Sequence, residues 1–189
     1  MSGTVVVTPF EQETRGRQMT VQQAEAAASR LLSTSWWLTS YEDSPIPVDP
    51  FVIAANLGIT VRRVRLPLDE SGNIVLAPDQ DPLISLNRGD SRARQRFTCA
   101  HEIGHYVRRV DGDSLQQQVV FVDRRAQLAS AGVDPDEIYA NQFAAALLMP
   151  ARAVQRGYVF EGQSVESLAR RFDTSVQAMN LRLRNLNLA

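Results

Sequence analysis

The stretch SRARQRFTCAHEIGHYVRR, residues 91–109, is the clearest helix in the sequence, and it contains both histidines of the chain. His101 and His105 are four residues apart, so on a helix their imidazoles lie within about 40° of one another. Glu102 lies about 100° around the helix from His101, where it can hydrogen-bond a water molecule without sharing the ligand face. This H-E-x-x-H arrangement is typical of two zinc ligands and a general base supplied by one helical turn.

The residues around the two histidines distinguish this interpretation from a charged helix that contains histidine by chance. The flanking positions 98–100 and 103–107 carry no acidic or arginine side chain, which an exposed charged helix would not show. Gly104 lies between the histidines although glycine disfavours a helix interior. Its presence predicts close approach of another element, or of the metal site, at that position.

A catalytic zinc ion takes three protein ligands and keeps one position for water. The chain has no third histidine, and its one cysteine, Cys99, lies about 200° around the helix from His101, toward the core. We therefore expect a carboxylate as third ligand. Glu137, in the helical segment DPDEIYANQFAAALLMP (134–150), is the best candidate, and Asp136 is its nearest rival. The alternative for Glu137 is an ordinary first-turn glutamate that complements the helix dipole.

Three further residues near these positions have candidate roles. Asn141 lies one turn after Glu137, where it could orient a zinc-bound histidine. Tyr106 and Tyr139 flank the site and could stabilise an oxyanion or contact substrate, although core packing explains each tyrosine equally well. Cys99 is expected to be a small buried side chain rather than a redox switch.

Composition excludes several classes of function. All twenty basic residues are arginine, so a P-loop lysine, a Schiff-base lysine and a lysine dyad are excluded. A single cysteine allows no intramolecular disulfide, which favours a reducing, cytoplasmic location. The net charge of −1 gives no strong field toward nucleic acid or membrane, and no apolar run is long enough to span a bilayer.

The length of 189 residues and 44% apolar content predict one main core. We expect a flexible arm, a metallopeptidase domain and a C-terminal helical subdomain packed on it, at residues 1–19, 20–160 and 161–189. The first helix is expected to begin at a Thr20 cap. Three short strands, at 59–66, 73–77 and 82–87, predict a small antiparallel meander, and 113–125 is compatible with a strand.

Four blocks of the sequence carry a resemblance to a known family. They are PVDPFVIAANLGITV, ISLNRGDSRARQRFTCAHEIGHYV, EIYANQFAAALLMP and SLARRFDTSVQAMNLRLRNL, and in order and spacing they resemble the ImmA/IrrE family of zinc metallopeptidases over about residues 45–188. Two positions depart from the family pattern. Tyr139 stands where the family often has a second acid, and Asn187 where it often has glycine.

The resemblance implies an α+β, zincin-like fold of gluzincin type, with a small antiparallel sheet of about three strands on the active-site helix and a helix-turn-helix-like C-terminal segment. It implies one Zn²⁺ per chain, held by His101, His105 and Glu137, with Glu102 as the catalytic base. The implied substrate is a separate helix-turn-helix repressor of a phage, mobile-element or stress regulon, inactivated by cleavage. The strand at 82–87 could bind an extended substrate by strand addition.

Two rival functions remain. The tail could make the protein a DNA-binding or adaptor regulator with a vestigial zinc-peptidase fold, since residues 151–189 contain six arginines against three acids. That excess is modest and helix pairs also serve for packing, so direct DNA binding is not expected. A peptidase of general specificity is the other rival, although a cytoplasmic endopeptidase without a prosegment favours a narrow substrate range.

Overall fold

A computed structural model describes residues 9–36, 45–77, 80–111, 119–124 and 134–189. The helices are α1 (Pro9–Ser35), α2 (Pro50–Asn56), α3 (Arg92–Asp111), α5 (Pro135–Leu148), α6 (Ala151–Gln155), α7 (Val165–Arg171) and α8 (Val176–Asn185), with a π-helical turn η1 (Arg156–Phe160) after α6. The strands are β1 (Thr60–Val64), β2 (Glu70–Ala77), β3 (Gln80–Asn87) and β4 (Val119–Arg124). None of the helices in the described ranges is long and apolar enough to cross a membrane.

The four strands form one sheet in the order β1-β3-β2-β4. β2 is antiparallel to both of its neighbours, whereas β1 is parallel to β3, with Arg62 opposite Ser85. The small sheet is as expected, but the purely antiparallel meander is not, because β1 skips β2 and pairs with the far edge of β3. The ambiguous segment at 113–125 supplies β4. Since β3 is paired on both edges, substrate cannot add to it as a strand, and that expectation is wrong.

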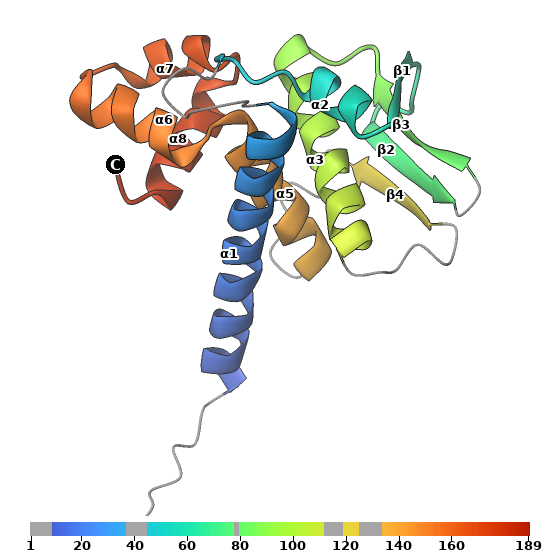
Figure 1. The fold of residues 1–189 in the computed structure, drawn as a ribbon, viewed down its shortest axis with the longest axis horizontal. Helices are drawn as coiled ribbons and strands as arrows, with labels where there is room; N and C mark the ends of the chain where they lie inside the picture. The colour runs from blue at the N-terminus through green and yellow to red at the C-terminus, as the bar shows by residue number, and fades with distance from the viewer. Residues whose placement is uncertain (1–8, 37–44, 78–79, 112–118, 125–133) are drawn as a thin grey trace, which may run out of the picture.

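The helices form layers on one side of this sheet (Figure 1). α3 packs on β2 and β3, α5 packs on α3, and α1 packs on α5. The core between the layers consists of fully buried apolar side chains, among them Ile74, Ile84, Ile103, Phe143 and Leu147. β3 leads into α3 through a short turn, so the sheet fixes the position of the helix that carries the histidines.

The N-terminal helix begins eleven residues earlier than its predicted cap. α1 starts at Pro9, so residues 9–19 of the expected arm are helical, and residues 1–8 lie outside the described part. Thr20 lies inside the helix, where its hydroxyl donates to the carbonyl of Gly16 at 3.0 Å instead of capping a first turn. The other domain boundaries stay a prediction.

Two buried arginines attach the C-terminal helices to the rest of the chain. Arg182 of α8 is 1% exposed, pairs with Glu25 of α1 and donates to the Met149 carbonyl at 2.9 Å. Arg96 of α3 donates to the Asp173 carbonyl at 3.1 Å, in the turn between α7 and α8. A buried guanidinium needs such partners, so α8 is held in place and not loosely appended.

Candidate metal centre

α3 brings the H-E-x-x-H residues into the interior of the molecule. Ser91 accepts a hydrogen bond from the Arg94 amide at 3.3 Å, which caps the first turn of α3. His101, Glu102 and His105 are each at most 2% exposed, so this helical turn is not a solvated charged face. Polar side chains at such depth need a specific role or a specific set of partners.

α5 contributes the carboxylate. Asp134 caps α5 by accepting from the Asp136 amide at 2.8 Å, and Pro135 occupies the first helical position, where its missing N–H is tolerated. Glu137 follows in the first turn and points toward α3. The rival Asp136 points elsewhere and pairs with Arg108 at 2.7 Å. The two acids are neighbours in sequence but about 100° apart around the helix, which explains this difference.

Gly104 allows the two helices to approach each other closely. A Cβ atom added at Gly104 would lie 3.1 Å from the Cα atom of Ala140 and 3.1 Å from Cδ1 of Phe143, both on α5. Carbon atoms in ordinary contact lie about 3.5–4.0 Å apart. The expectation that another element approaches at this glycine is therefore confirmed.

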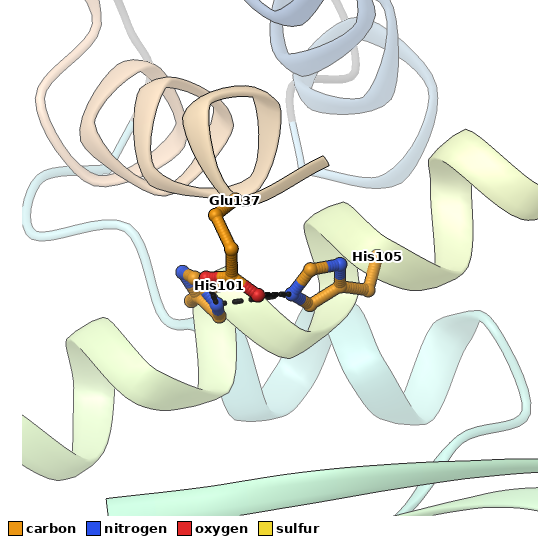
Figure 2. A group of neighbouring side chains, drawn as sticks. All are labelled: His101, His105 and Glu137. Atoms are coloured by element: carbon orange, nitrogen blue, oxygen red, sulfur yellow. Dashed lines mark hydrogen bonds and ion pairs between the residues drawn. The ribbon is translucent and has the colours of Figure 1, made fainter. Parts of the chain in front are cut away.

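Side chains from the two helices converge on one point (Figure 2). The Nε2 atoms of His101 and His105 are 3.1 Å apart. Oε2 of Glu137 lies 3.5 Å from Nε2 of His101, and Oε1 of Glu137 lies 3.4 Å from Nε2 of His105. These three residues form the one such cluster found in the described part of the chain. Glu102 is not a member, in agreement with its position on the helix.

The spacing of these donor atoms suits zinc. Zinc bonds to nitrogen and oxygen ligands are about 2.0–2.2 Å, so two ligands of a tetrahedral ion lie roughly 3.3–3.6 Å apart. The Nε2–Nε2 separation of 3.1 Å and the contacts of 3.5 and 3.4 Å to the two carboxylate oxygens of Glu137 are close to that range, and one ligand atom from each residue lies within 4.8 Å of the others. Two imidazoles and one carboxylate are also the donor types that catalytic zinc prefers. The residues present therefore fit a zinc ion with one position left open.

Asn141 supports the cluster from one turn along α5. Its Oδ1 lies 3.1 Å from Nδ1 of His101. Because an amide oxygen can only accept, this contact suits a His101 ring that carries its proton on Nδ1, the tautomer that binds a metal ion through Nε2. That is the arrangement a metal-binding histidine needs.

Burial and neighbouring groups set the protonation of the cluster. Burial lowers the pKa of His105, which favours the neutral imidazole that can bind a metal ion. Burial by itself would raise the pKa of Glu137, but hydrogen bonds with both histidines outweigh it and hold that pKa well below its usual range. Glu137 is therefore held as a carboxylate, the form that binds a metal ion.

The structure favours core packing for the remaining candidates. Tyr139 is 4% exposed, its ring stacks on Phe143 with centroids 6.2 Å apart, and burial raises its pKa. It lies about 200° around α5 from Glu137, on the opposite side of that helix. Tyr106 is half-buried against the same core. Cys99 is fully buried and burial raises its pKa, as expected for a packing residue.

A groove beside the cluster is lined by Asn141, which the sequence indicated, and by other residues that no sequence pattern singled out. It has a volume of about 260 Å³, and its lining includes Phe97, Ile138, Asn141 and Leu181. Leu181 lies on α8, far along the chain from the donor residues. Only the packing of α8 against the rest of the molecule reveals it, because helical periodicity assigns Leu181 to a face but not to a neighbour.

Comparison with known proteins agrees with this geometry. Residues 54–184 match the peptidase M78 family, described as the IrrE N-terminal-like domain. No curated protein matches the chain. The matched range covers more than half of the chain and includes both donor helices and the C-terminal helices. It confirms the ImmA/IrrE resemblance and the zincin-like α+β fold that the resemblance implied. The chain therefore belongs to the IrrE N-terminal-like family of M78 metallopeptidases.

Proposed function

We propose that this protein is a zinc-dependent endopeptidase that cleaves a separate helix-turn-helix repressor and so relieves repression. The observation that carries the proposal is the convergence of His101, His105 and the Glu137 carboxylate, which place one ligand atom each within 4.8 Å of one another. Family membership supports metal-dependent peptide hydrolysis. The repressor as substrate rests on the resemblance to the ImmA/IrrE family.

The ion would be held by the two Nε2 atoms and the Glu137 carboxylate, with Asn141 fixing the His101 ring. When bound, zinc supplies Lewis-acid chemistry, lowering the pKa of a water molecule and polarising a carbonyl group. Glu102 acts as the general base. Its carboxylate accepts a proton from the attacking water as the oxygen bonds to the scissile carbonyl carbon. The same proton then passes to the leaving amine nitrogen as the C–N bond breaks.

The burial of this turn contributes to the proposed chemistry. Glu102 is fully buried and both histidines are nearly so. In such surroundings electrostatic interactions are less screened than in water. Weaker screening strengthens the interaction between the Glu102 carboxylate and a water molecule from which it accepts a proton.

Glu102→Gln tests the assignment directly. We expect the variant to bind zinc like the parent, because Glu102 is outside the donor cluster, and to lose cleavage because an amide cannot accept the proton. The zinc-loaded protein and the variant would be incubated with the repressor encoded beside the gene. The products would be identified by mass spectrometry, and zinc content measured in parallel. Cleavage at an unchanged rate by the zinc-loaded variant would contradict the role of Glu102.

A DNA-binding or adaptor role is the second candidate, because α7 and α8 form a helix pair of helix-turn-helix type. Three of the six arginines that motivate this role are already buried or paired within the protein. Arg182 is buried, and Arg156 and Arg171 both pair with Glu161, at 3.1 and 2.7 Å. A gel shift over a salt series tests this role. Retardation that weakens as salt rises would support DNA binding, and its absence at physiological salt would support the peptidase.

A further inference from the structure

The groove beside the donor cluster continues directly from it along α5. Ile138, Asn141, Ala145 and Met149 line it, and on a helix they form a single face. Asn141 also contacts His101 at 3.1 Å, so one side chain belongs to both the groove and the cluster. Phe97, one turn before His101 on α3, lines the groove as well, with its ring centroid 6.5 Å from that of His101. A peptide held at the metal would thus have this groove beside it.

α8 supplies the opposite wall of the groove. Ala178, Leu181 and Asn185 line it from that helix, at a spacing that places them on one face. The Leu181 side chain is 56% exposed. A single exposed leucine is ordinary on a protein surface. Leu181, however, lines the same groove as Phe97 and Asn141, which lie beside the donor cluster. The buried pair between Arg182 and Glu25 holds the wall in place.

The lining decides what kind of side chain the groove accepts. Its hydrophobic members come from three helices, and among the described residues that line it none is acidic. Of its two cations, Arg182 is already paired with Glu25 and the Met149 carbonyl, and Arg17 comes from α1. These lining residues would therefore not neutralise a lysine or arginine of the substrate. An apolar side chain would gain roughly 25 cal/mol for each Å² of surface it buries there.

We infer that this groove binds an apolar side chain next to the scissile bond, and that Leu181 of α8 is a specificity-determining residue. The inference rests on the proposed peptidase function and assigns the C-terminal helix pair to substrate recognition. The groove of about 260 Å³ is smaller than the sites that hold drug-sized ligands, and suits one large side chain with its flanking backbone.

The test measures which peptides the protein retains. Zinc-loaded Glu102→Gln would be incubated with a library of blocked synthetic peptides, and the retained peptides identified by mass spectrometry. We expect enrichment of leucine, isoleucine, methionine or phenylalanine at one position. Adding Leu181→Asp should reduce this enrichment roughly tenfold or more, since one hydrophobic contact discriminates about 10–200-fold. Leu181→Met should preserve it, because volume and polarity are nearly kept.

Val176→Asp is the matched control, since Val176 is a 42% exposed apolar residue of α8 that does not line the groove. It should leave the enrichment unchanged, and thermal unfolding checks that each variant is folded. Retention of the same peptides by Leu181→Asp and its parent, or no apolar preference in the parent, would overturn the inference. Cleavage of the repressor by the wild type is scored separately. Cleavage without an effect of Leu181→Asp removes only the groove assignment, whereas apolar retention without cleavage removes only the peptidase function.

Discussion

Replacing Gly104 with alanine tests whether the contact between α3 and α5 sets the geometry of the metal centre. The new Cβ would lie 3.1 Å from Cα of Ala140, 3.1 Å from Cδ1 of Phe143 and 3.3 Å from Cβ of Phe143. The two shortest distances are about 0.4 Å or more below the carbon–carbon optimum near 3.5–4.0 Å. The Phe143 ring could rotate away, but Ala140 Cα is backbone. α5 must therefore move relative to α3.

Two effects oppose each other in Gly104→Ala. Overpacking a core costs about 1–3 kcal/mol, while alanine gains about 1 kcal/mol over glycine in a helix interior. The net result should be a loss of roughly 0–2 kcal/mol in the free energy of unfolding without metal. Gly16→Ala is the matched control, because Gly16 lies in α1 and a Cβ atom there would meet no described atom within 4 Å. It should gain up to about 1 kcal/mol.

The movement of α5 also displaces Glu137, one turn before Ala140. We expect the zinc affinity of Gly104→Ala to fall by about tenfold, the lower end of what residues supporting metal ligands contribute. Chemical denaturation in EDTA measures the free energy of unfolding without metal. Competition with a chromogenic chelator measures the zinc affinity. If Gly104→Ala were as stabilising as Gly16→Ala and bound zinc like the wild type, the close approach of the helices would not control the site.

Three further substitutions, two of them with a matched control, examine the metal cluster and the contacts that support it. Glu137→Ala should abolish tight zinc binding in the chelator competition, whereas Asp136→Ala, one residue away, should leave it within about twofold. Asn141→Leu should lower zinc affinity about 10–100-fold while the protein stays folded by circular dichroism; unchanged affinity would refute its orienting role. Arg182→Met should cost about 1–3 kcal/mol in urea unfolding, because it leaves the buried Met149 carbonyl without its donor. Arg30→Met, in an exposed pair, should cost no more than about 1 kcal/mol, and equal losses would contradict this distinction.

The clustering of His101, His105 and Glu137 could be predicted from the sequence, because each step was local or followed from the number of histidines. The helical period places His101 and His105 on one face, and the lack of a third histidine leaves a carboxylate. A proline and an aspartate mark where α5 begins, which sets the phase that separates Glu137 from Asp136. Gly104 was informative because a costly residue in a helix needs a packing reason.

Features that depend on long-range pairing could not be predicted in this way. The alternation of apolar residues indicates a strand but not its partner, so the parallel pairing of β1 with β3 was missed. The start of α1 was missed because Thr20 is compatible with a cap and with a helix interior, where its hydroxyl bonds to the preceding turn. The groove wall at Leu181 depends on how α8 is anchored by a buried arginine, a residue type that composition alone assigns to the surface.

The division of the donor atoms between α3 and α5 also has a consequence during protein synthesis. The ribosome releases the histidine pair before β4 and before Glu137, at about 5–20 residues per second. For that interval the growing chain presents two imidazoles and Glu102 without the Glu137 carboxylate that completes the cluster. Under the proposed function, hydrolysis can begin only after α5 has folded onto α3.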